Sequence, residues 1–529
     1  MKTDHLITKK ARPRWIKLLY ILAIIALTLI ILNIVASSIA TRKIRNILQK
    51  SHPCVTVDFD YTRVNILNRS VKIGGVELKS DTTVPDFRIH INQIKISGIG
   101  ILRLITGKSA SIRKVELKKP EIKGNLDYLV NFKKTDKAIA QDTVSSETKK
   151  AFTVHVHKIH LADAKIDSVI IPGVFPFQDI ENANIKLYDF DLFLGDDKAE
   201  YTLGDAIVEM KKAQFRLPGD YYNIDFRNLH VRMKDSTIHI DSFNLTPNYG
   251  KYKFGNVKGI QTDRFEVRIG KLGIHGFDLN SVLKNKGLLI REIAIDGLLL
   301  HVFRDKRLPF DYTNFPPLPQ QALNKLKFPV AVNDILVSNM FVEYSEINNV
   351  SNDPGVIFLD DLKIAVNNFA NRQSNPTEAN IVINGEGMLL GECPVVVEFI
   401  LPINTVNDTF YFNGAASELD MAKLNQMVQP LTNVHVTSGN LAAAEFHGSA
   451  NGEYSGGTFK MLYQDLAFEI LKGADVNEPA KPKAFLSFVA GTVVRESNPI
   501  ADHDPKIVEM YFERDKNKGF FNFFWKSLL

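Results

Sequence analysis

The chain of 529 residues is 45% hydrophobic and 23% charged, a composition that excludes wholesale disorder. Its formal net charge is +6, but residues 1–50 alone contribute +9 from ten Lys or Arg and one Asp, so the remaining residues carry −3. The basic excess therefore lies beside an apolar segment and does not form a nucleic-acid-binding surface. Two cysteines, Cys54 and Cys393, are too few for a disulfide framework or a zinc site. We expect two buried thiols, with one long-range disulfide as the alternative.

Residues 18–39 form an apolar stretch without a charge, LLYILAIIALTLIILNIVASSI. As a helix this stretch is about 33 Å long, enough to cross a hydrocarbon core of about 30 Å. The preceding flank is more basic than the following one, which predicts a cytoplasmic N-terminus. A signal peptide cleaved near Ser38-Ile39-Ala40 is the alternative, but its apolar core would be shorter. We therefore predict a basic tail at 1–17 and an uncleaved transmembrane helix at 18–40.

Apolar residues recur at i, i+3, i+5, i+8 and i+10 in six segments further along the chain. These segments start at Ile91, Ile112, Val156, Ile269, Ile290 and Val332. The first three starts precede the last three by 178, 178 and 176 residues. A block of roughly 180 residues therefore occurs twice, at about 87–170 and 265–346, as is typical of elongated, stacked architectures.

The spacing of these segments predicts strands. On a helix the five positions do not share a face, whereas a strand keeps its face at steps of two and changes it at steps of three. We expect a bulge or tight turn at each three-residue step. A leucine-rich repeat is the rival interpretation, but that motif has Asn or Cys near the ninth position. Here that position holds Ile99, Pro120, Ala164, Phe277, Leu298 and Met340.

Other expected elements follow in chain order. VKIGGVELKS predicts a hairpin at Gly74-Gly75, and NIVINGEGMLL predicts another at Asn384-Gly385. Loops are expected at 131–150, 305–327 and 472–483. Residues 417–431 read as a helix with a capping box of Ser417 and Asp420. The end of the chain is either a helix in a membrane interface or a helix that closes the end of the sheet, and its interface candidates are Phe520, Phe521, Phe523, Phe524 and Trp525.

Motifs that carry catalytic chemistry are missing from the sequence. The densest ionisable cluster, VHVHKIH, contains His155, His157 and His160, but neither Cys nor carboxylate adjoins it, so we expect a solvated strand face. GEGMLLG at 385–391 lacks the spacing of a dinucleotide-binding loop. The sequence contains no phosphate-binding loop, HExxH or GxSxG motif. We therefore expect a protein that is not an enzyme, without catalytic residues, metal or cofactor.

Four segments resemble the AsmA-like family of inner-membrane-anchored periplasmic proteins, which is distantly similar to bridge-like lipid transfer proteins. The first is the N-terminal anchor followed by YTRVNILNRSVKIGGVELKS. The second and third are ILRLITGKSASIRKVELKKPEIKG at 101–124 and DLNSVLKNKGLLIREIAIDGLLLHVFRD at 278–305. The fourth, at 418–470, looks like the C-terminal module of the family. These are apolar spacings rather than catalytic motifs, so they are specific for architecture and weak for mechanism.

The resemblance implies a mostly β fold: an elongated, strongly curved antiparallel sheet that forms a lengthwise apolar groove, with short helices. The first part of the groove would occupy 41–330, the second part with the AsmA-like module 331–506, and the aromatic segment 507–529. The groove candidates are Ile94, Ile96, Val115, Leu117, Ile159, Leu161, Leu272, Ile274, Ile293, Ile295, Ile335 and Val337.

The expected function follows from the anchor, the repeated apolar spacing and the resemblance. We expect a single-pass inner-membrane protein, periplasmic in bulk, that binds or conducts phospholipid or another lipid and supports outer-membrane assembly or lipid homeostasis. Its expected partners are the inner membrane and, at the C-terminal end, a second membrane or an outer-membrane assembly protein. The alternative is a scaffold for outer-membrane proteins whose apolar face is a closed core without lipid. Because an acyl chain gains about 0.8 kcal/mol per CH₂ on leaving water, an open apolar face could shield lipid.

Overall fold

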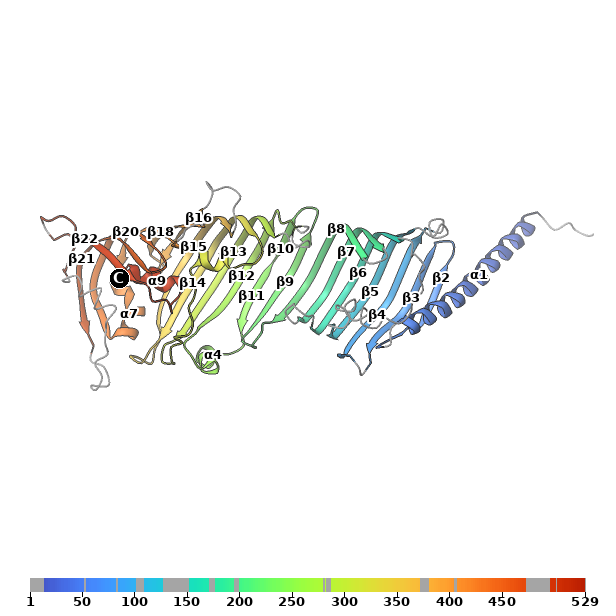
Figure 1. Cartoon of the computed structure of the whole chain (residues 1–529), viewed down its shortest axis with the longest axis horizontal. Coiled ribbons are helices and arrows are strands. Elements are labelled where there is room, and N and C mark those ends of the chain that lie inside the picture. Colours follow the sequence, from blue (N-terminus) through green and yellow to red (C-terminus); the bar gives the residue numbers. More distant parts are fainter. Residues whose placement is uncertain are drawn as a thin grey trace, which may run out of the picture. The chain divides into compact units, whose positions relative to one another are not determined.

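The computed structural model describes residues 14–51, 54–81, 84–100, 109–126, 152–170, 177–194, 199–278, 281, 287–371, 380–403, 407–471, 495–500 and 502–528. These residues are mostly β, and their strands belong to one mixed sheet of 22 strands (Figure 1). The chain divides into two compact units, residues 1–209 and 210–529, with the boundary inside strand β8. The loops predicted at 131–150 and 472–483 lie outside the described residues.

The first unit begins with one long helix and continues in strands. Its elements are α1 (Arg14–Ser51), β1 (Val55–Asp58), β2 (Tyr61–Asn65), β3 (Ser70–Ser80), β4 (Phe87–Ile99), β5 (Ser109–Asn125), β6 (Phe152–Ile170), β7 (Phe177–Leu194) and β8 (Ala199–Arg216), which runs across the boundary. Helix α1 includes a segment, Leu22–Asn46, that is long and apolar enough to cross a membrane. By length and composition, one N-terminal helix in the described part of the chain fits a membrane span.

The second unit contains the remaining strands and four short α-helices among its described elements. The strands are β9 (Tyr222–Arg232), β10 (Thr237–Ile240), β11 (Ser242–Pro247), β12 (Asp263–His275), β13 (Leu288–Asp305), β14 (Val330–Ile347), β15 (Gly355–Ala370), β16 (Asn380–Leu389), β17 (Cys393–Pro402), β18 (Phe410–Ala416), β19 (Leu419–Asp420), β20 (Val434–Ala450), β21 (Tyr454–Ile470) and β22 (Ile507–Glu513). The helices are α4 (Lys251–Lys258), α6 (Pro319–Asn324), the 3₁₀ turn η3 (Met421–Leu424), α7 (Asn425–Thr432) and α9 (Phe520–Ser527).

The same order of strand pairings occurs in both units. Strand β4 pairs antiparallel with β5, β5 pairs parallel with β6, and β6 pairs antiparallel with β7. In the second unit, β12, β13, β14 and β15 repeat this order of orientations. The expectation of a purely antiparallel sheet is therefore wrong at two pairs. A parallel neighbour needs a long connection that returns the chain to the same end of the sheet, and residues 126–151 and 306–329 supply it.

A left-handed residue stands at the seventh position after the start of every repeated segment. These residues have positive φ values between 47° and 70°, the region that favours glycine, and they are Gly98, Lys119, Asp163, Gly276, Gly297 and Asn339. Five of the six are Gly, Asp or Asn, which adopt this conformation at the lowest cost. The register shifts between Leu161 and Ala164 in β6, and again between Val337 and Met340 in β14, 176 residues later. The bulge expected at this three-residue step is therefore present in these two strands.

Apolar residues three positions apart in a strand can share one apolar cluster. Ile91 and Ile94 are three residues apart, yet both belong to one apolar cluster with Val76. Ile290 and Ile293 likewise share a cluster in the second unit. A regular strand would have placed such residues on opposite faces.

Three local predictions were wrong. Gly74 and Gly75 lie inside the continuous strand β3, where Gly75 has φ +59°, and not in a turn. Asn384 and Gly385 lie inside β16, so that predicted hairpin is also absent. Both stretches pair with neighbouring strands over more residues than a local hairpin at the predicted turn would allow. The predicted helix at 417–431 starts later, because the Asp420 side chain accepts a hydrogen bond from the N–H of Ala422 and caps η3.

Gly276 offers a test of the left-handed position. A Cβ at Gly276 would lie 2.7 Å from the Cβ of Arg291, whereas at Gly297 the nearest atom is 3.8 Å away. Both glycines have φ near +70°, so Gly297→Ala should cost about 1 kcal/mol from backbone strain alone. We expect Gly276→Ala to lower the urea midpoint more than Gly297→Ala does. Gly250→Ala is the control, because Gly250 has φ −61° and nothing within 4 Å of a Cβ. Equal midpoints for the two left-handed sites would contradict the close contact with Arg291.

Candidate functional site

Two rows of aliphatic side chains cross the strands of the first unit. Residues in a row are cross-strand partners, so they lie beside one another on one face of the sheet. One row is Ile73, Ile94, Leu117, Leu161 and Ile185. The other row is Val71, Ile96, Val115, Ile159 and Leu187.

The second unit has two corresponding rows. One is Ile240, Leu272, Ile295, Val337 and Ile364, and the other is Ile238, Ile274, Ile293, Ile335 and Val366. All twelve groove candidates from the sequence thus lie in four rows, six in each unit. The alignment depends on strand register, which brings the i+3 and i+5 positions of neighbouring segments together.

The residues of the rows are partly exposed, and several of the residues that flank them along the strands are buried. All twelve candidates at i+3 and i+5 are neither buried nor fully exposed. The flanking positions behave differently, since the buried residues at i are Ile91, Val156, Ile290 and Val332, and those at i+8 are Pro120, Ala164, Phe277 and Met340. Each unit therefore presents an apolar strip of partly exposed aliphatic side chains to its surroundings. Apolar area that stays in contact with water costs about 25 cal/mol per Å² in free energy relative to the same area when buried.

Ion pairs occupy the other face of β5 to β7. Lys114 and Glu116 alternate with Val115 and Leu117, and the Lys114 Nζ lies 2.7 Å from a Glu116 carboxylate oxygen. This hydrogen bond lowers the pKa of Glu116 below its ordinary value. The Nδ1 of His160 lies 3.5 Å from the same carboxylate, and burial lowers the pKa of His160. The sheet is thus amphipathic here, with one apolar and one polar face.

The histidine cluster has carboxylate partners that sequence reasoning missed. His155 Nδ1 lies 2.6 Å from Asp191 Oδ1, and His157 Nδ1 lies 2.7 Å from Asp189 Oδ1. Both aspartates come from β7, whose register against β6 was not visible in the sequence. Within the described ranges, no group of three or more His, Cys, Asp or Glu side chains is placed to hold a metal ion.

A row of charged side chains crosses β12, β13 and β14, nine residues along each strand from the nearer apolar row of the second unit. Asp263, Arg304 and Glu346 are cross-strand partners on β12, β13 and β14. Arg304 donates two hydrogen bonds to Asp263, at 2.6 and 2.7 Å, and the Lys306 Nζ lies 2.7 Å from Glu346. The hydroxyl of Tyr344 donates to Glu346 at 2.6 Å, and burial raises the pKa of Tyr344, so this donor stays protonated.

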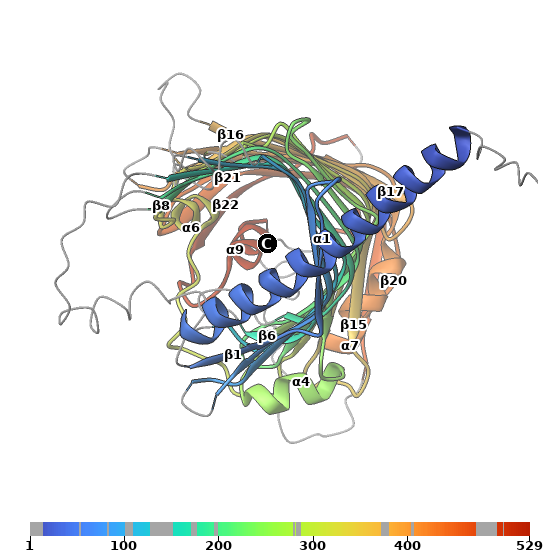
Figure 2. The same cartoon turned by 90° about the vertical axis from the view of Figure 1, so that its right-hand side faces the viewer.

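The C-terminal aromatic residues divide between a core and a surface. Phe523 is 1% exposed, and Phe520 and Phe524 pack with it against β17 and β18 in one apolar cluster. Leu318 and Leu323 of the α6 region join this cluster, and Figure 2 shows α6 and α9 near β22. Phe520, Phe523 and Phe524 therefore belong to a helix that covers this end of the sheet and are not free for a membrane surface. Phe521 and Trp525 are 80% and 53% exposed.

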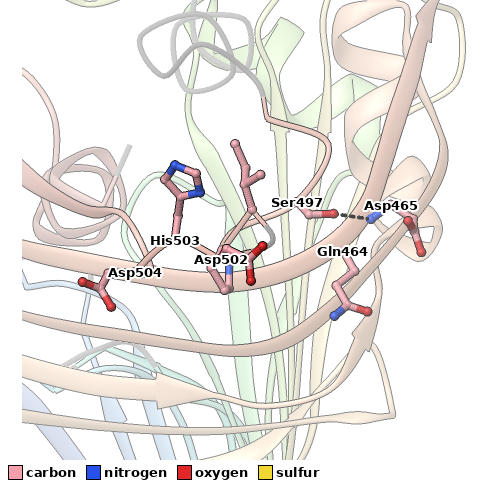
Figure 3. Close-up of a pocket in the computed structure, with 8 residues that line it drawn as sticks. Gln464, Asp465, Ser497, Asp502, His503 and Asp504 are labelled. Carbon is pink, nitrogen blue, oxygen red and sulfur yellow. Dashed lines mark hydrogen bonds between the residues drawn. The ribbon is translucent and has the colours of Figure 1, made fainter.

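Two further features lie outside the apolar rows. Cys54 and Cys393 are both free thiols, and burial raises the pKa of Cys393. A polar hollow of about 590 Å³ lies between β21 and the segment before β22, lined by Gln464, Asp465, Ser497, Pro499, Ile500, Asp502, His503 and Asp504. In Figure 3 the Ser497 hydroxyl accepts a hydrogen bond from the backbone N–H of Asp465. This bond belongs to the local fold.

The Lys114–Glu116 pair predicts an acid-dependent loss of stability. A carboxylate whose pKa is lower in the folded than in the unfolded protein stabilises the fold above the unfolded pKa, and this contribution disappears as the pH falls through the folded pKa. We expect the thermal midpoint of the parent to fall between about pH 5 and 3, and that of Glu116→Gln to fall less. Glu121→Gln, an exposed change on the same strand, is the control. A parallel pH profile for Glu116→Gln and the parent would exclude a stabilising role for this carboxylate.

The comparisons with known proteins leave the family open. No protein-family model matches this chain, and no curated protein sequence matches it. The resemblance to AsmA-like proteins therefore rests on the four sequence segments alone.

Proposed function

We propose that this protein is an AsmA-like, membrane-anchored protein of the cell envelope that holds phospholipid along an apolar groove of a curved sheet. The observation that carries the proposal is the partial exposure of the aligned rows, such as Ile293 with Ile335 and Ile295 with Val337. Aliphatic side chains that lie beside one another across several strands and remain partly exposed suit the chemistry of acyl chains. The protein acts by shielding lipid, without catalysis or a cofactor.

The energetics favour an occupied groove. Each CH₂ of an acyl chain that leaves water contributes about 0.8 kcal/mol, and covering the rows removes their own apolar area from water as well. Asp263, Arg304 and Glu346 form a charged row near one end of β12, β13 and β14. In this proposal the lipid tail lies on the apolar rows, and the polar headgroup lies beyond them.

The anchor supports a location in the inner membrane. In the proposal, α1 crosses that membrane once, with its N-terminus in the cytoplasm and the strands in the periplasm. The apolar side chains of Leu22–Asn46 are mostly exposed, as a lipid-facing helix requires. Phospholipid or another lipid is the cargo. Exposed Phe521 and Trp525 offer a contact for a second membrane or an outer-membrane assembly protein at the C-terminal end.

A scaffold without lipid is the second candidate, and one observation favours it. The apolar face of β17 and β18 is closed by α6 and α9, where Phe410 and Phe523 are nearly fully buried. If the apolar face is filled in the same way throughout, the sheet serves as a rigid docking element for outer-membrane proteins.

Adjacent residues of β14 test the lipid proposal. Ile335 lies in an apolar row, whereas Leu336 is 43% exposed on the opposite face. We expect Ile335→Glu, alone or with Ile293→Glu, to reduce by several-fold the phospholipid that mass spectrometry finds with residues 41–529 purified without detergent, because a buried carboxylate disfavours acyl contact. Leu336→Glu adds the same charge and should leave the lipid content unchanged. Equal loading of the three variants would place the lipid elsewhere.

Cysteine labelling distinguishes the open lipid groove from the closed scaffold. Val337→Cys in a Cys54→Ser, Cys393→Ala background should react with a small maleimide after delipidation and be protected when phospholipid is restored. Leu336→Cys should react in both states. A Val337→Cys thiol that is unreactive in the folded, delipidated protein would indicate a closed core and favour the scaffold.

A further inference from the structure

Polar residues of helix α1 contact one edge of the sheet. Strand β2 has β3 as its partner strand, and its other edge meets α1. The backbone N–H of Val64 donates to the Ser37 Oγ at 2.8 Å, and the N–H of Ile66 donates to the Asn33 Oδ1 at 2.9 Å. The two acceptors are one helical turn apart, about 6 Å, and the two donors are two strand residues apart, about 6.6 Å, so the edge and the helix match in spacing.

The contact lies inside the segment that fits a membrane span. Asn33 and Ser37 both belong to Leu22–Asn46. Asn33 precedes Arg42 by nine residues, about 13 Å along the helix axis, with no charged residue between them. An unpaired backbone N–H at that depth would cost several kcal/mol, since lipid offers no hydrogen-bond partner. The side chains of Asn33 and Ser37 remove this cost at two positions of the β2 edge.

The turn between β2 and β3 has an apolar tip. Ile66 is 42% exposed and Leu67 is 67% exposed at the end of this hairpin. Arg69 follows in the turn, and Arg63 and Tyr61 lie further up β2, with the Arg63 guanidinium 5.0 Å from the Tyr61 ring. Apolar side chains at a tip with Arg and Tyr behind them follow the order of acyl chains and headgroups across a membrane interface.

We propose that the β2–β3 turn inserts into the leaflet beside α1, with Ile66 and Leu67 among the acyl chains and Tyr61 and Arg63 at the headgroups. The first strands of the sheet then begin within the bilayer and not above it. The inference rests on α1 spanning a membrane, which is part of the proposed function, and it is independent of whether the apolar rows carry lipid.

A fluorescent probe at the tip tests the insertion. The full chain, in the Cys54→Ser, Cys393→Ala background, is reconstituted into vesicles of phosphatidylethanolamine and phosphatidylglycerol and labelled with NBD at Leu67→Cys. We expect a blue-shifted emission and quenching by doxyl-labelled phospholipid. A probe at Ile31→Cys, exposed on α1, reports whether the helix spans the bilayer, and one at Asn92→Cys on β4 reports a solvated position of the same unit.

The outcomes separate the two proposals. Quenching at Ile31 and Leu67 but not at Asn92 supports the inserted turn. Quenching at Ile31 alone overturns the insertion and leaves the anchor intact. No quenching at Ile31 overturns the membrane anchor itself, and with it the insertion. A Leu67 probe that is blue-shifted but insensitive to doxyl lipid indicates a covering protein, which also overturns the insertion.

The hydrogen bonds to α1 give a second, matched test. Asn33→Leu removes the acceptor for Ile66 and should reduce quenching of the Leu67 probe, because the hairpin loses its fixed position against the helix. Ser38→Leu makes a similar polar-to-apolar change at an exposed position of α1 and should leave the quenching unchanged. Unchanged quenching in both variants would mean that Asn33 does not position the turn.

Discussion

The apolar face of this protein depends on one backbone constraint, the left-handed residue seven positions after the start of each repeated segment. A strand turns its side chains over at every residue, so a three-residue step would send the next apolar residue to the polar face. At Asp163 and Asn339 the bulge absorbs the extra residue and restores the face. Without this device the apolar residues at i+8 and i+10 would lie on the opposite face from those at i+3 and i+5.

The apolar surface of the second unit is partly exposed in one region and covered by helices in another. At β12 to β14, the side chains of the apolar rows stay partly exposed. At β17 and β18, the short helices α6 and α9 cover the sheet, and the aromatic ring of Phe523 is buried. Because covering an apolar face removes the drive to bind lipid, an open and a closed region on the same sheet have different capacities for cargo. This contrast is the structural basis for the choice between lipid carrier and scaffold.

The first sheet edge raises a separate physical problem. An edge strand exposes unpaired backbone groups, which attract other strands in water and are costly in lipid. Here α1 lies along the edge, and its polar side chains accept hydrogen bonds from Val64 and Ile66. These hydrogen bonds explain why polar residues occur in this otherwise apolar helix. Helix α1 and the first strands of the sheet are thus joined by hydrogen bonds within the first unit.

The sequence by itself determined the apolar helix, the strand-like spacing and its recurrence after about 180 residues, because these are periodicities of side-chain chemistry along one chain. The Gly, Asp and Asn residues at the left-handed position were also visible in the sequence and could have identified the bulges. Only the tertiary structure decided which strands pair, and so it decided the two parallel pairs, the continuous β3 and β16 in place of hairpins, and the contact of His155 with Asp191. The reason is that local turn signals at Gly75 or Gly385 compete with long ladders to neighbouring strands, and a ladder of many hydrogen bonds outweighs the preference of one dipeptide.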